Sequence, residues 1–197
     1  SVFIGGISSS LFCSLDKLIV GLRLGSSSLS IYSIASLIAS QINLFVSLLV
    51  QPSVHVFPRF RSGNSADDRL MRYANLSIVM GPALAVLSIA LWPLASYVFW
   101  GNTHNHYAIL DARQAVLLMC LIYGVYSCNC YGYYWSLSRG DYLKSSRIIL
   151  TAGLTALILM AVVPLRYGIF GIIFCNAAYI LTCLLTVYAL NGRFAAV

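Results

Sequence analysis

The stretch from Ser14 to Ala35 gathers residue types that can do chemistry in a chain with very little charge. Asp16, Lys17 and Arg23 lie close together there, whereas charged residues make up only 9% of the 197 residues. A carboxylate can hold a proton or a cation, and Lys and Arg can hold an anion. The same residues can also form a local ion pair at a helix end, with the arginine reaching the membrane surface. Both interpretations stay open.

The composition predicts an integral membrane protein. Hydrophobic residues make up 60% of the chain, and the mean hydropathy is +0.86. Twelve Lys and Arg face five acidic residues, all of them Asp. A soluble domain usually carries about 25% charged residues. So few charges cannot cover a water-soluble surface, and we expect membrane lipids and no nucleic acid as partners.

The residue patterns of catalysis and metal binding are missing from the sequence. It has no paired carboxylates, no Gly-rich phosphate loop, no HExxH motif and no Ser/His/Asp set. Cys128 and Cys130 lie two residues apart, so on a helix they point to different sides. Cysteines in apolar segments usually behave as small hydrophobic residues. We therefore expect no enzyme, no catalytic residue, no metal and no cofactor.

The intervals between charges predict the fold class: an all-α, polytopic transmembrane bundle. A membrane helix needs about 20 apolar residues, and barrel strands are much shorter than these apolar runs. Residues 1–197 are expected to form a single membrane domain with polar loops at 58–72, 100–107 and 138–147. The six predicted spans are about 1–22, 29–51, 75–99, 112–137, 146–164 and 168–190.

The distribution of Lys and Arg predicts the orientation. Eight of them fall at the ends that carry both termini, and four, including Arg113 and Arg166, fall at the other end. Cytoplasmic loops carry an excess of Lys and Arg. Both ends of this chain are therefore expected in the cytoplasm.

Polar residues inside the spans mark faces that meet protein or water. One stripe in the second span allows either a helix–helix interface or the wall of a hydrophilic cavity, and Gln41 lies off it. A Gly81-Pro82 pair allows a kink in the third span. Aromatic residues near Asn129 suit an interfacial belt or, less well, sugar stacking. The stripe consists of Ser36, Ser40, Asn43 and Ser47.

Residues 15–60 resemble the polysaccharide biosynthesis family of O-antigen and capsule flippases, within the multidrug/oligosaccharidyl-lipid/polysaccharide (MATE-like) exporter superfamily. In that family an Asp-containing span end leads through an apolar, Gly-containing turn to Leu-Gly and Gly-x-Tyr-x-x-Ala. Ser30 stands where glycine is usual, and segments 107–121, 136–146 and 165–181 are also similar to the family. The matching residues are Asp16, Gly21, Leu24, Gly25, Tyr32 and Ala35.

The resemblance implies the C-terminal half of a two-bundle transporter in the bacterial inner membrane, so the chain is expected to be a fragment without the N-terminal six-helix bundle. It also implies a flippase that carries a lipid-linked oligosaccharide or polysaccharide repeat unit by alternating access. Its partners would be the polyprenyl pyrophosphate-linked sugar, membrane lipids and polysaccharide polymerase machinery. A multidrug or lipid II exporter, or a membrane enzyme such as a polymerase, remains the alternative.

On this hypothesis, particular residues have particular roles. Asp16 is the candidate for the coupling ion. The candidates for the substrate headgroup and the cavity are Lys17, Arg23, Arg113, Gln41, Asn43 and Asn129.

Overall fold

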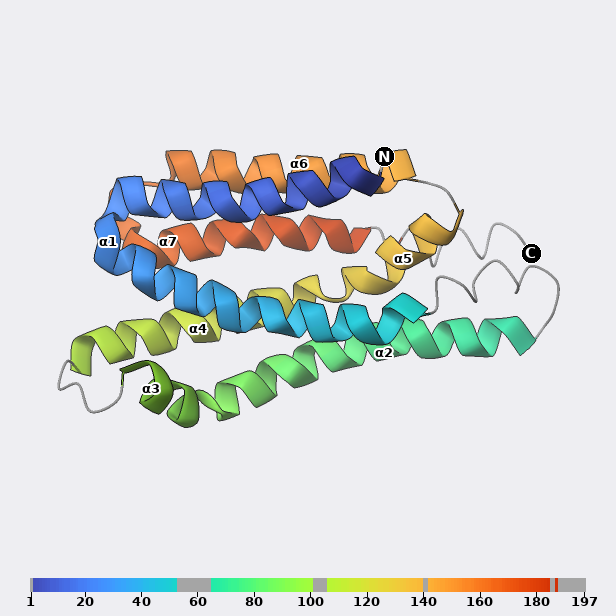
Figure 1. The fold of residues 1–197 in the computed structure, drawn as a ribbon, viewed down its shortest axis with the longest axis horizontal. Helices are drawn as coiled ribbons and strands as arrows, with labels where there is room; N and C mark the ends of the chain where they lie inside the picture. Colours follow the sequence, from blue (N-terminus) through green and yellow to red (C-terminus); the bar gives the residue numbers. More distant parts are fainter. Residues whose placement is uncertain (1, 53–64, 101–105, 140–141, 185–186, 188–197) are drawn as a thin grey trace.

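The computed structural model describes residues 2–52, 65–100, 106–139, 142–184 and 187, and every element within these ranges is a helix (Figure 1). This confirms the all-α prediction for that part of the chain. The predicted loop residues 58–64 and 101–105, and Arg193, lie outside it. The elements are α1 (Val2–Val50), α2 (Ser65–Ala90), α3 (Trp92–Trp100), α4 (His106–Tyr126), α5 (Asn129–Arg139), α6 (Tyr142–Val162), η3 (Leu165–Tyr167), α7 (Gly168–Cys175) and η4 (Asn176–Cys183).

The first two predicted spans form one element that folds back on itself. Element α1 consists of two helices joined at Gly25, which has a non-helical backbone with φ 84° and ψ 179°. This conformation is essentially restricted to glycine. Figure 1 shows the two arms, 2–24 and 26–50, running in opposite directions and spreading apart from this bend. The turn expected at 23–28, between the first two predicted spans, is thus reduced to one residue.

The third and fourth predicted spans are each broken, which the sequence analysis did not predict. The third is interrupted at Leu91, between α2 and α3, because Pro93 has no N–H to give to the carbonyl of Ile89. Helix α2 stays continuous through Pro82, where a kink had been considered. The fourth is interrupted at residues 127–128, between α4 and α5.

Two predicted loops are shorter than expected, because the neighbouring helices extend into their polar sequence. Helix α2 begins at Ser65, inside the predicted loop 58–72. Helices α5 and α6 together take up most of 138–147. The last predicted span begins as α7 and then tightens into the unusually long 3₁₀ helix η4.

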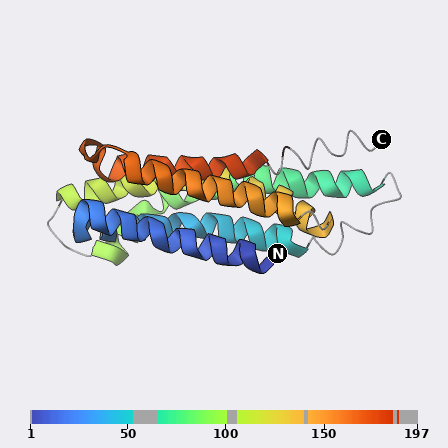
Figure 2. The ribbon, with the colours of Figure 1, turned by 90° about the horizontal axis from the view of Figure 1, so that it is seen from above.

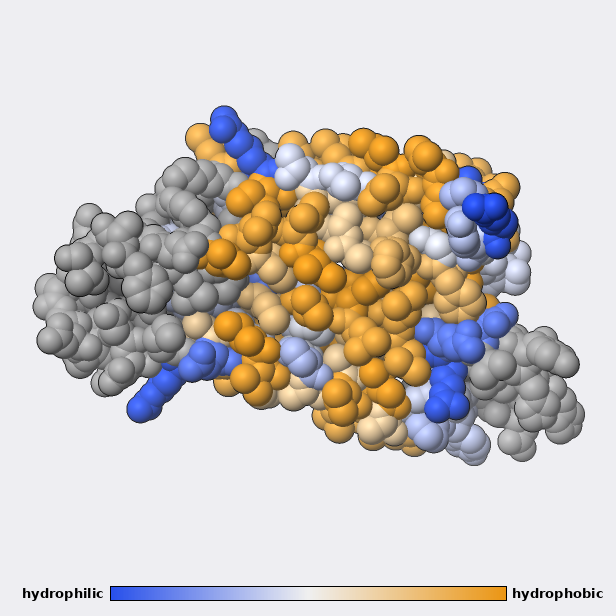
Figure 3. Space-filling view, turned by 180° about the vertical axis from the view of Figure 1, so that it is seen from behind, coloured by the Kyte–Doolittle hydropathy of each residue, from blue (hydrophilic) through white to orange (hydrophobic). Residues whose placement is uncertain are grey.

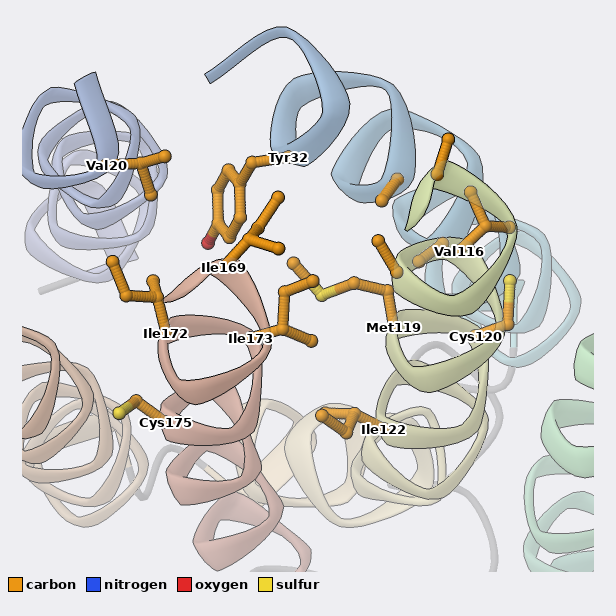
Figure 4. Packing of buried hydrophobic residues seen from close by; sticks show 14 of the residues in the cluster. Val20, Tyr32, Val116, Met119, Cys120, Ile122, Ile169, Ile172, Ile173 and Cys175 are labelled. Atoms are coloured by element: carbon orange, nitrogen blue, oxygen red, sulfur yellow. The ribbon is translucent and has the colours of Figure 1, made fainter. Parts of the chain in front are cut away.

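The helices run along one long axis and pack around α4 (Figures 1 and 2). The main buried cluster joins both arms of α1 to α2, α4, α6 and α7, and includes Val20, Tyr32, Met119 and Ile173. Figure 4 shows Tyr32 from α1, Met119 from α4 and Ile173 from α7 converging. Both arms of the hairpin therefore help to build the core.

Helices α2 and α4 meet at two glycines. A Cβ atom on Gly81 would lie 2.5 Å from the carbonyl oxygen of Gly124, and one on Gly124 would lie 2.9 Å from the Cβ of Ala85. Small residues at such crossings let the backbones of membrane helices approach closely. This contact fixes α2 against the centre of the bundle.

The outer surface is that of a multi-pass membrane protein. Large apolar side chains such as Leu22, Phe45 and Val162 are exposed, and Figure 3 shows an apolar middle between hydrophilic ends. The described residues contain five helices long and apolar enough to cross a membrane. They are Ser14–Val50, Arg72–Ala90, Asp111–Ser138, Ser145–Val162 and Leu165–Cys183.

The first of these five segments contains residues 14–24 of the first arm and all of the second arm. At about 1.5 Å per residue, each complete arm could cross a hydrocarbon core about 30 Å thick. The count of six spans stays a prediction.

We predict that Gly25→Ala destabilises the protein through its backbone alone. No atom lies within 4 Å of the position of an added Cβ, so a steric clash is not the cause. An Ala forced into this conformation should cost about 1–3 kcal/mol and lower the Tm in detergent. The matched control is Ser26→Ala at the exposed next position. Equal Tm values for the two variants would contradict the strained turn.

Candidate functional site

Asp16 lies in a buried hydrogen-bond network that ties the hairpin to the last helix. Its side chain is 3% exposed. The hydroxyl of Tyr32 donates to the Asp16 carboxylate at 2.8 Å, and the Asn176 amide donates to the Tyr32 hydroxyl at 3.1 Å. Tyr32 and Asn176 are fully buried. The network around this carboxyl group thus links three parts of the fold: the first arm of α1, its second arm and η4.

The sequence analysis did not give Tyr32 or Asn176 a role at this site. Tyr32 was noted only as a motif residue, and Asn176 was not singled out. An Asn in an otherwise apolar last span was the available indication, because polar side chains within membrane helices usually face protein. Its partner could not be known without the packing of η4 on the hairpin.

Lys17 does not share the burial of its neighbour. Its side chain is exposed, and its contact with Asp16 is made by its backbone N–H, which donates to the carboxylate. Arg113 is also exposed. Both cations are therefore open to an anionic partner.

Arg23 has a structural partner. Its guanidinium donates to the carbonyl oxygen of Met160 at 2.6 Å. In a regular helix that carbonyl would accept from the N–H of residue 164, but Pro164 has none. Arg23, which lies on the hairpin, therefore caps the last turn of α6 by supplying the missing donor. An anion bound to Arg23 would compete with this hydrogen bond.

Two cysteine thiols contact backbone carbonyl groups at other irregular points of the helices. Pro82 leaves the carbonyl of Ile78 without its helical donor, and the Cys128 thiol lies 3.9 Å from that oxygen. At the break after α4, the Cys183 thiol lies 3.8 Å from the carbonyl oxygen of Tyr126 and 3.3 Å from that of Val125, which already accepts from the Cys128 N–H. Thiols are weak donors. These cysteines are thus weak polar partners at helix breaks as well as small packing groups.

The remaining predicted polar residues divide by their surroundings. The Asn129 amide donates to the Thr182 hydroxyl at 2.9 Å, and both residues are buried. On the predicted stripe, Asn43 accepts from the Cys130 thiol and Ser47 bonds Tyr134 at 2.5 Å. Asn43 and Ser47 thus lie at a helix–helix interface with α5. Gln41 is exposed.

The aromatic residues of α5 form a packed cluster. Tyr131 and Trp135 are buried with Ala74 of α2, next to Tyr73 and Tyr134. An interfacial belt or a sugar-stacking platform would need exposed rings. The burial of Tyr131 and Trp135 fits neither interpretation of these two residues; they hold α5 to the start of α2.

The chemistry open to this arrangement is binding. A single buried carboxyl with hydroxyl and amide neighbours can hold a proton or a small cation, whereas hydrolysis needs a positioned acid and base. Within the described ranges, no group of three or more His, Cys, Asp or Glu side chains is arranged to hold a metal. Comparisons of the chain with protein-family models, curated proteins and solved structures found no match.

We predict that Arg23→Met destabilises the fold more than Lys17→Met does. The first change keeps an apolar stem but leaves the Met160 carbonyl without its donor, which should cost about 1–3 kcal/mol. The second removes an exposed charge and should change the unfolding free energy by no more than about 0.5 kcal/mol. Unfolding in detergent measures both, and Arg23→Lys should recover part of the loss. Equal effects would argue against the capping role.

Proposed function

We propose that this chain is part of a membrane transporter that moves a lipid-linked oligosaccharide across the bacterial inner membrane by alternating access. The observation that carries the proposal is the buried network around Asp16. A carboxyl group within a membrane bundle is costly, and it usually marks a path or a coupling site for protons or ions. The substrate class rests on the resemblance of residues 15–60 to the O-antigen and capsule flippases.

The position of Asp16 suits a coupling role. The Asp16 carboxylate accepts a hydrogen bond from Tyr32, and Asn176 donates to the Tyr32 hydroxyl. The charge of Asp16 therefore acts on the contact between both arms of α1 and η4. A proton or cation arriving at Asp16 would change the hydrogen bonding among these three elements. Binding energy that differs between two arrangements is what shifts a transporter from one to the other.

The polar residues that remain exposed suit the substrate headgroup. Lys17 and Arg113 are exposed cations, and Gln41 is an exposed amide. Arg23, Asn43 and Asn129 contact other parts of the fold, so we assign them to the substrate only in a state where those contacts open. A water-filled cavity with cations lowers the cost of moving a pyrophosphate and its sugars through hydrocarbon.

The wider proposal follows from the resemblance and the charge distribution. The full protein would have two six-helix bundles, of which this chain supplies six spans with both ends in the cytoplasm. Paired repeats around a central site are common in transporters. The polymerase machinery for the same polysaccharide would use the product on the outer side.

We predict that Asp16→Asn and Tyr32→Phe lower transport about tenfold or more, in line with coupling energies between sites. The test uses cells in which the full-length protein is the sole flippase for the lipid-linked unit. Export is measured as the amount of unit reaching the outer leaflet, beside the protein level. Undecorated single units should accumulate on the cytoplasmic leaflet.

The matched control is Asp111→Asn, which alters an exposed acid at the start of α4. It should leave export and protein level unchanged. Normal translocation with a shortened polymer would contradict the flippase and favour a polymerase. Unchanged export in Asp16→Asn, with deletion of the gene still blocking translocation, would remove only the coupling role.

A further inference from the structure

The second arm of α1 has one face in the core and one face on the outside of the bundle. Ile42 and Val46 belong to the buried face, and Figure 1 shows this arm crossing in front of α4. On the outer face, four exposed side chains follow one another at i, i+4, i+7 and i+11, so they form one stripe along the helix. We call this stripe the Gln41 seam; it consists of Leu37, Gln41, Leu44 and Leu48.

The spacing of the Gln41 seam is that of a two-helix coiled coil. Its steps of four, three and four residues alternate as the a and d positions of a heptad do. Leu37 and Leu44 take d positions, and Gln41 and Leu48 take a positions. A single polar residue at an a position fixes the register and the number of helices in such a coil. The seam is therefore suited to pairing with another helix along its length.

Gln41 lies at the middle of a membrane-spanning arm. The nearest charged residues along the chain are Arg23 and Arg59, each 18 residues away, and the arm lies within a segment apolar enough to cross a membrane. Within the part of the chain that the structure describes, the Gln41 amide makes no hydrogen bond. An unpaired amide in hydrocarbon is costly. Gln41 therefore needs a hydrogen-bond partner from outside the described helices.

We propose that the Gln41 seam pairs with the same seam of a second copy of this chain, in a parallel dimer whose two-fold axis runs along the membrane normal. Copies with one charge distribution insert in one orientation, so equal residues of two chains lie at the same depth. Gln41 then faces the partner's Gln41, and an amide can both donate to its copy and accept from it. Any other helix would need its own polar side chain at this depth and register.

The dimer does not depend on the proposed transport function, but it affects the residues available for it. Gln41 is covered in the dimer, so it is not open to a substrate headgroup there. Lys17 and Arg113 remain as the exposed candidates for that role.

Energy transfer between donor- and acceptor-labelled copies of the full-length protein in liposomes tests the dimer. Transfer in the wild type should rise with the ratio of protein to lipid as expected for two associating chains. Gln41→Leu keeps the apolar face but removes the hydrogen bond between the helices, and it should weaken association about three- to tenfold. Gln41→Asn keeps an amide and should recover part of the loss.

Matched controls separate the seam from other exposed positions. Asn75→Leu changes an exposed amide on a different helix, α2, and should leave association unchanged. Leu44→Ala should weaken association, whereas Leu154→Ala, at a similarly exposed leucine of α6, should not. Under mild oxidation in membranes, Gln41→Cys should cross-link two chains more than the wild type does with its own six cysteines.

Three results would overturn the proposal. Energy transfer no higher than that of random collisions would show that the wild type is a monomer. Cross-linking of Gln41→Cys to another segment of its own polypeptide, located by peptide mapping, would assign the seam to the rest of the same protein. Reduced export in Gln41→Leu, with association unchanged, would assign Gln41 to the substrate.

Discussion

Backbone carbonyl groups in a membrane bundle have no water to bond, so every break in a helix needs a donor from elsewhere in the protein. Helical hydrogen bonding is interrupted at Pro82, within the continuous helix α2, at Pro164 and after Tyr126. Side chains from other elements supply the donors: Cys128 for Ile78, Arg23 for Met160 and Cys183 for Tyr126. Because each donor comes from a different element, the local irregularities also become links between helices.

This constraint shapes the candidate site as well. Several polar side chains of the spans make contacts between helices, as Asn129 does with Thr182 and Asn43 with Cys130. Asp16 differs, because a carboxyl group is a far more expensive group to bury than an amide or a thiol. Its neighbours Tyr32 and Asn176 offset part of that cost while tying the hairpin to the last helix.

Composition and charge spacing were enough to predict a helical membrane bundle and the approximate place of its elements, since both depend on the chain's overall balance of apolar and charged residues. The break at Leu91 could have been predicted from Pro93. The break at residues 127–128 could not, because no proline marks it; the chain there makes tighter backbone hydrogen bonds, from Cys128 to Val125 and from Cys130 to Ser127. Asp16 was identified as a candidate from its type, but its link through Tyr32 to Asn176 depends on packing between residues 144 apart in the chain.

The single-residue turn at Gly25 has a consequence for movement within the bundle. One residue joins the two arms of α1, so no flexible linker separates them. Any large movement of one arm relative to the other has to change the backbone at Gly25. The hydrogen bond from Tyr32 to Asp16 joins the same two arms, so the turn and this bond together limit how they can separate.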